Sequence, residues 1–199
     1  MTTVADLRAR FAAPGERARL KQLDRLDRHC RRFIALSPFV VLATGAPGGP
    51  LDASPRGGAP GFVVVRDDTT LLIPDAPGNN RLDTLENLIT QPRLGALFMI
   101  PGVDETLRIN GDAELSVAAD DIAACTTERR APKLVIRVTV QEAYLHCAKA
   151  LLRSKLWHHE SRQPRSVLPT AGQMLIDQTG IVTAPETQEE MVRRYQADL

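Results

Sequence analysis

The side chains best suited to binding a phosphate group in this sequence are those of two arginines in separate loops. Arg81 follows a turn sequence, Pro77 to Asn80, that leads directly into a helical pattern. The first backbone N–H groups of a helix lack internal partners and carry a partial positive charge, so they stabilise an anion. We expect Asn80 to cap this helix and Arg81 to complete the anion site.

The second arginine, Arg56, lies in the sequence Ser54-Pro55-Arg56-Gly57, which predicts a rigid turn before an apolar run. Guanidinium groups from two different loops can bind a phosphate dianion bidentately. Two alternatives stay open on these residues alone. Arg56 could be an ordinary surface residue, and Asp83, near the start of the same helix, could cap the amides that an anion would bind.

The charge balance and the aromatic content argue against a nucleic-acid partner. Lys and Arg number 25 against 24 for Asp and Glu, so no strong positive field surrounds the chain. One Trp, two Tyr and five Phe are too few for a row of base-stacking platforms. No apolar run approaches the roughly 20 residues of a membrane span, and the N-terminus lacks the apolar core of a signal peptide. We expect a cytoplasmic protein that binds no membrane.

Metal binding and cysteine chemistry are not expected. The three cysteines, Cys30, Cys125 and Cys147, form no Cys-x-x-Cys pair, which suits reduced and mostly buried thiols. The adjacent histidines of His158-His159 diverge on a helix or a strand, and no third ligand is evident. His146 and Cys147 would point to opposite faces of a strand, so they do not form a nucleophilic pair.

The middle of the chain is rich in short β-branched and apolar runs separated by turn sequences. These runs predict strands at residues 39–43, 62–65, 70–73, 94–100, 105–115 and 133–146. The run at 94–100 is almost wholly apolar, which predicts burial on both faces. The fold class that fits is mainly β with added α: a six-stranded antiparallel Greek-key split β-barrel with peripheral helices.

Helical spacing of apolar residues predicts helices around this barrel. In the helix at 81–90 we expect Leu82, Leu85, Leu88 and Ile89 to point inward. The predicted helices cover residues 16–36, 81–90, 118–127, 171–178 and 186–197. The resulting domain organisation is a helical extension (1–36), the barrel (37–160) and a helical tail (161–199) packed on the barrel or on a partner chain.

The order of these features resembles the FMN-binding split β-barrel family of pyridoxamine 5'-phosphate oxidase. The resemblance covers roughly Ser37 to Trp157 and includes Asn79-Asn80-Arg81 before a helix that ends at Gln91-Pro92. It continues through LGALFMIP (94–101) and ETLRINGDAEL (105–115). The segment HCAKALLRSKLW (146–157) is similar to the closing segment of a bacterial subgroup of these flavoproteins.

The resemblance implies a homodimer that packs barrel to barrel, with FMN in a groove at the interface. It assigns the FMN phosphate and ribityl chain to Ser54, Arg56, Asn79, Asn80 and Arg81. No metal is implied.

The resemblance also places Thr106 where relatives have a polar residue that reaches the flavin. Arg108 lies two positions after Thr106, so strand alternation puts both side chains on the same face of the strand. We expect Arg108 to contact the flavin or the substrate. Ser154, Lys155 and Trp157 are candidates for the flavin edge, where a cation or hydroxyl stabilises the reduced flavin. The alternative for Trp157 is a core or interface aromatic.

By this resemblance the protein is an FMN-dependent oxidoreductase that passes electrons or hydride from NAD(P)H or another donor to a small acceptor. The flavin carries the chemistry, so the sequence identifies no catalytic acid or base. The C-terminal half lacks the usual Trp and Arg substrate-binding ending of the founding enzyme, so oxidation of pyridoxamine phosphate is not expected. Two alternatives stay open: a flavin-binding or sensor protein without turnover, and a split barrel that binds F420 or haem.

Overall fold

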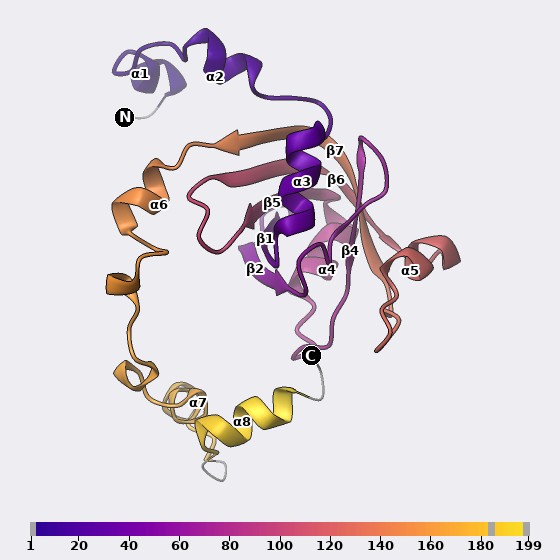
Figure 1. Ribbon diagram of the computed structural model, residues 1–199, viewed down its shortest axis with the longest axis vertical. Helices are drawn as coiled ribbons and strands as arrows, with labels where there is room; N and C mark the ends of the chain where they lie inside the picture. Colours follow the sequence, from indigo (N-terminus) through magenta and orange to yellow (C-terminus); the bar gives the residue numbers. More distant parts are fainter. Residues whose placement is uncertain (1–2, 183–185, 197–199) are drawn as a thin grey trace. The chain divides into compact units, whose positions relative to one another are not determined.

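The structure is a computed structural model that describes residues 3–182 and 186–196 (Figure 1). The chain divides into two compact units, Met1–Ala150 and Leu151–Leu199. The domain boundaries predicted at residues 36 and 160 stay predictions. In the described part of the chain, no helix is both long enough and apolar enough to cross a membrane.

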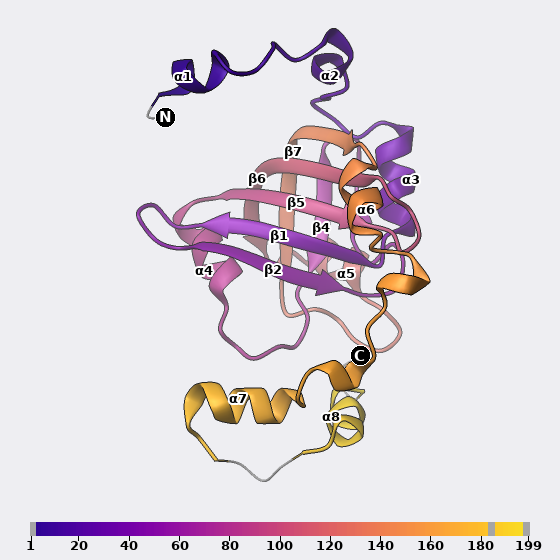
Figure 2. The same cartoon turned by 90° about the vertical axis from the view of Figure 1, so that its left-hand side faces the viewer.

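The first unit is built on one antiparallel sheet whose strands run in the order β2-β1-β5-β6-β7-β4-β3 (Figure 2). The predicted mainly-β split-barrel fold is therefore confirmed, with seven strands in place of six. The strands are β1 (Phe39–Gly45), β2 (Leu51–Gly57), β3 (Val64–Val65), β4 (Thr70–Pro74), β5 (Arg93–Met99), β6 (Thr106–Ser116) and β7 (Val135–His146).

The strand that the sequence did not predict is β2. Residues Ser54 to Gly57 were expected to form a turn, but they extend β2 and pair with β1, with Pro55 opposite Val41. Proline has no backbone N–H and is tolerated in sheets mainly on edge strands. Since β2 is the edge of this sheet, Pro55 fits there without the loss of a ladder hydrogen bond.

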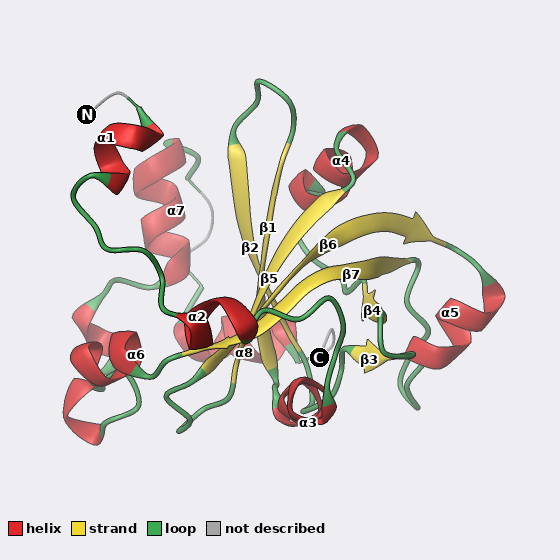
Figure 3. Ribbon diagram, turned by 90° about the horizontal axis from the view of Figure 1, so that it is seen from above, coloured by secondary structure: helices red, strands yellow, loops and turns green. Residues whose placement is uncertain are grey.

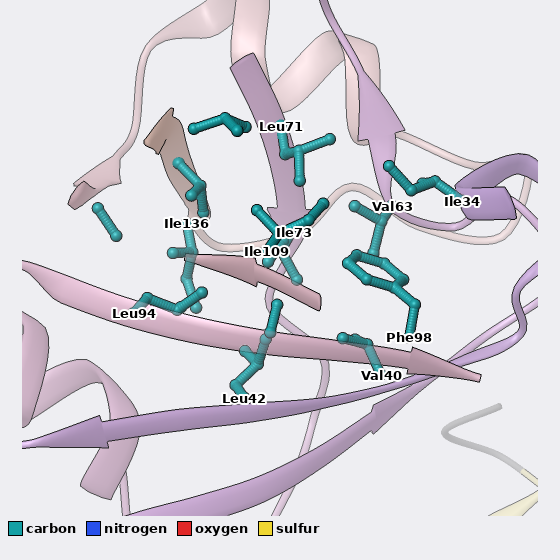
Figure 4. Packing of buried hydrophobic residues seen from close by; sticks show 14 of the residues in the cluster. Ile34, Val40, Leu42, Val63, Leu71, Ile73, Leu94, Phe98, Ile109 and Ile136 are labelled. Carbon is teal, nitrogen blue, oxygen red and sulfur yellow. The ribbon is translucent and has the colours of Figure 1, made fainter. Parts of the chain in front are cut away.

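The core lies on the inner face of the sheet, where alternate residues of neighbouring strands meet (Figure 4). Leu42, Phe98 and Ile109, from β1, β5 and β6, are fully buried there. On β5 the buried residues alternate with half-buried ones, so the prediction that both faces of this strand are buried is wrong. The outer face carries the half-buried residues, which matters for the site below.

Two of the three cysteines are packing residues. Cys30 and Cys125 are buried free thiols, and burial raises the pKa of each to about 11, so both stay protonated near neutral pH. Cys147 is an exposed free thiol.

The predicted helix at residues 16–36 is interrupted. The structure has α2 (Glu16–Leu20) and α3 (Arg28–Leu36), preceded by α1 (Val4–Arg8). Between them, the backbone of Leu23 exchanges two hydrogen bonds with Ala143 of β7. The carboxylate of Asp27 then accepts from the N–H groups of His29 and Cys30 and caps α3. A backbone pairing and a new cap thus replace the middle of the expected helix.

The helix α4 (Asp83–Thr90) packs against β1 and β6, and α5 (Ala119–Cys125) packs against β4 and β7 (Figure 3). Leu85 and Leu88 of α4 are buried as expected. Leu82 and Ile89, however, are 49% and 73% exposed, so their predicted inward orientation is wrong.

A buried carboxylate fixes α5 to the sheet. Asp121 accepts hydrogen bonds from Arg66 (2.7 Å), Arg137 (3.1 Å) and the Ser116 hydroxyl (2.7 Å). The bond from Ser116, together with the charges of Arg137 and Arg66, lowers the pKa of Asp121 although burial opposes this.

We expect Asp121→Asn to lower the free energy of unfolding by about 2 kcal/mol near neutral pH, because both arginines lose their shared anion. Because the pKa of Asp121 is lower in the folded protein than its ordinary value of 3.8, the charged carboxylate stabilises the fold at pH values above 3.8. This stabilisation is lost as the pH falls through the pKa of the folded protein. The difference from the wild type should therefore shrink in acid. Urea unfolding at several pH values measures it, with Asp120→Asn, an exposed neighbour on α5, as the control. Equal losses of unfolding free energy in Asp121→Asn and Asp120→Asn would contradict the role of Asp121 in fixing α5 to the sheet.

The second unit contains short helices only, within the described residues. After α6 (Lys149–Ser154), which crosses the boundary between the units, come η1 (His159–Ser161), η2 (Arg165–Val167), α7 (Ala171–Thr179) and α8 (Gln188–Tyr195). Thr170 caps α7, and Thr187 forms a capping box with Glu190 at α8. The predictions of helices at 171–178 and 186–197 agree with α7 and α8, although Ala197 lies outside the described residues.

Candidate functional site

A cluster of polar side chains lies where β2 meets the first turn of α4. Asp52, Ser54 and Arg56 alternate along β2, so they share one face of the strand, and all three are half-buried. Thr84, in the first turn of α4, is buried against them with 1% exposure. Together with Thr44 of β1, these residues are called the Asp52 cluster below.

The Asp52 carboxylate organises this cluster. Its Oδ1 accepts a hydrogen bond from the Ser54 hydroxyl (2.8 Å), and its Oδ2 accepts from the Thr84 hydroxyl (2.6 Å). The Thr44 hydroxyl adds a longer bond of 3.4 Å to Oδ2. One carboxylate thus joins β1, β2 and α4, which fixes the first turn of the helix on the sheet.

Arg56 points to the same helix turn. Its Nη2 donates to the Thr84 hydroxyl (3.2 Å), and its Nη1 donates to the carbonyl of Pro55 (2.9 Å). Neither acceptor is charged, so these two contacts are not ion pairs, and the guanidinium lies beside the start of α4. The prediction that Arg56 lies close to this helix is consistent with that contact.

The helix α4 begins without a side-chain cap. Its N-cap is Leu82, with a left-handed φ of 60°, and no side chain accepts from the first amides at this position. Asn80, with a φ of 59°, was predicted to be the N-cap, and this is wrong. The Asn79 side chain instead accepts from the backbone N–H of Arg81 (3.1 Å) and bends the chain before the helix. Left-handed backbone is costly for residues other than glycine, and such strain is concentrated at functional sites.

Arg81 and Asp83 form an exposed ion pair at this helix start. The Nε of Arg81 donates to Asp83 Oδ2 at 2.8 Å, and the two side chains are 72% and 44% exposed. Asp83, and then Asp52, raises the pKa of Arg81, while the Arg81 hydrogen bond lowers the pKa of Asp83. The Asp83 carboxylate therefore faces Arg81, and the alternative in which it caps the helix amides is not what the structure shows.

A second group of predicted residues lies on the outer face of the sheet. In the β6–β7 register, Thr106 is opposite His146 and Arg108 is opposite Tyr144. Directly opposed residues point to the same side of a sheet, so these four side chains share one face. The Arg108 guanidinium lies 4.3 Å from the centroid of the Tyr144 ring, within range of a cation–π contact.

The structure brings some of the predicted site residues together and leaves others apart. Ser54 and Arg56 are linked through Asp52 and Thr84, and Asn79 bonds to Arg81 beside them in sequence. Thr106 and Arg108 lie instead on the outer face of the sheet. Ser154, Lys155 and Trp157 belong to the second unit, so their assignment to the flavin edge stays a prediction. Within that unit, the Ser154 hydroxyl donates to the Leu151 carbonyl (3.1 Å), Lys155 lies 3.6 Å from Glu160, and Trp157 is half-buried.

Two functional candidates, Asp52 and Thr84, were missed by sequence reasoning. The alternation of Asp52, Ser54 and Arg56 could have indicated a strand with one polar face, had Pro55 not suggested a turn. Thr84 could not be found from spacing, because it meets Asp52 only through the packing of α4 on the sheet.

Two hollows on the surface are lined by other residues. One is lined by Arg31, Ala35, Gly61 and residues 63–65, and the other by residues of α8. Neither includes a member of the Asp52 cluster.

The sequence from residue 26 to residue 147 matches the family model described as pyridoxamine 5'-phosphate oxidase. The matched segment contains β1 to β7, the Asp52 cluster and the outer face with Arg108. The chain belongs to this family. Membership confirms the resemblance found in the sequence.

Three solved structures to which the chain is similar share little sequence with it. HupZ of Group A Streptococcus is 15% identical, with coverage of 60% of this chain and 93% of that chain and a TM-score of 0.49. An FMN-binding protein of Syntrophomonas wolfei is 12% identical (59% and 83% covered, TM-score 0.47). A pyridoxinephosphate oxidase family protein of Clostridium acetobutylicum is 10% identical (59% and 85%, TM-score 0.46). Likeness at this level carries no argument about function. No curated protein matches the chain.

Proposed function

We propose that the protein is a cytoplasmic FMN-dependent oxidoreductase that works as a homodimer. The observation that carries the proposal is the uncapped first turn of α4, with Arg56 bonded to Thr84 in that turn and Arg81 immediately before it. Helix amides and two arginines are the groups that bind a phosphate monoester. In a member of the pyridoxamine 5'-phosphate oxidase family, the phosphate of FMN is the ligand that this site suits.

The exposed ion pair between Arg81 and Asp83 does not oppose phosphate binding. Exposed pairs contribute little to stability, because water and salt screen them. A phosphate dianion offers Arg81 a stronger, charge-assisted acceptor. Arg81 can therefore exchange Asp83 for the phosphate, while Arg56 stays fixed by Thr84.

Asp52 has a positioning role in this proposal. Its carboxylate is already saturated by hydroxyls from Ser54, Thr84 and Thr44. It holds β2 and α4 together. Ser54 then contributes to FMN binding chiefly by way of Asp52.

The dimer is supported by the outer face of the sheet. Phe39, Val41, Leu97 and Met99 are half-buried on this face, and the register aligns Val41, Leu97 and Arg108 across three strands. An apolar face of this kind is suited to contact with a second copy. In the proposed dimer, one copy binds the phosphate at its Asp52 cluster, on the inner side of β2 where Ser54 is opposite Leu42, and the flavin ring lies against Thr106 and Arg108 on the outer face of the other copy.

FMN, when bound, supplies the electron and hydride chemistry. The residues of this chain bind the phosphate, orient the ring against the outer face of the sheet and exclude water once two chains meet. Their contribution to the reaction is thus placement and charge rather than a dedicated acid or base.

Anaerobic mixing of the FMN-loaded protein with NADH or NADPH tests the redox part of the proposal. We expect the visible flavin absorbance to bleach with one of the two donors and to return when an acceptor is added. Protein that keeps FMN but stays oxidised with both donors would contradict turnover with a nicotinamide donor and would favour a flavin-binding protein without it.

A further inference from the structure

Arg108 is a half-buried arginine that lacks a hydrogen-bond acceptor. Within the described part of the chain it donates no hydrogen bond, and its Nε is buried without a partner. The nearest carboxylate, Glu142 Oε2, is 3.7 Å from Nη2, which is too long for a hydrogen bond. Arg66 and Arg137, which are exposed to a similar degree, both donate to Asp121. A buried Nε without a partner, in a guanidinium that Glu142 reaches only at long range, indicates an acceptor that the single chain does not supply.

The surroundings of Arg108 are positively charged. Lys21 lies with its Nζ 4.9 Å from the centroid of the Tyr144 ring, against which Arg108 also packs. Lys21 is held there because its Nζ donates to the carbonyl of Leu145 (2.9 Å), next to the backbone pairing of Leu23 with Ala143. This interruption of the expected N-terminal helix therefore brings a second cation to the outer face.

The carboxylate that pairs with Arg108, that of Glu142, is already engaged. Its carboxylate accepts hydrogen bonds from the side-chain amides of Gln22 and Asn110, both at 2.9 Å. Lys21 and Arg108 carry two positive charges and Glu142 carries one negative charge, so one positive charge is in excess. A monoanion would balance this charge, whereas a dianion would meet the repulsion of Glu142.

His146 lies at the edge of the same group, with its ring centroid 4.9 Å from that of Tyr144. Burial, followed by the charges of Arg108 and Lys21, lowers its pKa below the ordinary 6.5. The imidazole is therefore mostly uncharged at neutral pH, and it offers a donor or an acceptor to a polar group of a ligand.

We propose that Lys21, Arg108, Tyr144 and His146 form a subsite for the carboxylate of a small organic acid, which is the substrate of the proposed flavoenzyme. The guanidinium binds the carboxylate bidentately, and the Tyr144 ring supplies a flat surface for the body of the molecule. Thr106, opposite His146, places the subsite directly beside the position proposed for the flavin. This inference rests on the proposed function, which puts the flavin ring on the same face.

The test uses the full-length protein loaded with FMN and titrated calorimetrically with benzoate, a planar monocarboxylate. Benzamide, its neutral counterpart, is the ligand control. We expect benzoate to bind and benzamide to bind at least about tenfold more weakly. Arg108→Met and Lys21→Met should each weaken benzoate binding by about 10- to 100-fold, the loss expected for a charge-assisted contact. Arg93→Met, which removes an exposed arginine from the start of β5, should leave it unchanged.

Flavin absorbance, recorded for every variant, separates the two claims. Lys21→Met that keeps FMN and loses benzoate supports the subsite, and Lys21 is exposed, so its replacement should not disturb folding. Equal binding of benzoate and benzamide, or unchanged binding in Arg108→Met, overturns it. Displacement of FMN by benzoate also overturns it, since Arg108 would then pair with the flavin. A wild-type protein without affinity for FMN refutes the proposed function, and benzoate titration of that protein still decides whether Lys21 and Arg108 bind a carboxylate.

Discussion

Arg56→Met and Arg81→Met are each expected to weaken FMN binding by about 10- to 100-fold, with a larger loss when they are combined. Each substitution removes a guanidinium that can donate to the phosphate at the uncapped start of α4. The quenching of FMN fluorescence on titration with protein measures the affinity. Arg130→Met is the matched control, because Arg130 is an exposed arginine in the loop after α5. Equal affinity in all of these variants would remove the phosphate site from the account.

Asp83→Asn tests the same site in the opposite direction. In the free protein, Asp83 accepts two hydrogen bonds from Arg81, and the phosphate must replace it. Without the carboxylate charge, FMN should bind a few-fold more tightly, as expected for the loss of an exposed ion pair. Weaker binding in Asp83→Asn would show that Asp83 supports the cofactor rather than competing with it.

Leu97→Asp is expected to convert the proposed dimer to a monomer and to weaken FMN binding by at least about 100-fold. Leu97 lies on the outer face of β5 between Val41 and Arg108, so the new charge would be buried against the second copy. The inner core is not touched, because Leu97 points away from it, and the monomer should stay folded.

Sedimentation velocity and circular dichroism together measure this outcome. Val117→Asp is the control, since Val117 is an apolar residue that is 75% exposed outside the outer face of β1, β5 and β6. A dimeric Leu97→Asp protein that keeps FMN would contradict the proposed interface. A folded monomer that keeps FMN would show that one chain completes the cofactor site.

Most strands could be predicted from the sequence because their physical cause is local. β1, β4 and β6 follow β-branched or alternating runs, and the Arg66-Asp67-Asp68 turn joins β3 to β4 as an antiparallel hairpin. The edge strand β2 was missed because Pro55 is typical of turns, and only the position of the strand at the sheet edge makes it acceptable there.

The start of α4 was beyond local reasoning. A sequence of two asparagines before a helix favours a side-chain cap, yet Asn79 bonds to Arg81 and leaves Leu82 at the cap position with a left-handed backbone. The tertiary contacts of Thr84 with Asp52 and Arg56 accompany this conformation. The two arginines were identified from their loops, whereas the carboxylate that organises their site was not.

The charged group around Arg108 shows the same limit. Strand alternation placed Arg108 and Thr106 on one face, but Lys21 arrives from a segment more than a hundred residues away through its bond to Leu145. No local pattern indicates such a pairing, since the sequence around Lys21 is that of an amphipathic helix.

The most direct test of the central claim is the visible absorption spectrum of the freshly purified full-length protein, followed by mass analysis of the molecule released on denaturation. The account predicts flavin bands and the release of FMN, or uptake of added FMN by a colourless preparation. A protein that neither carries nor takes up FMN, or that releases a deazaflavin or haem, would contradict it.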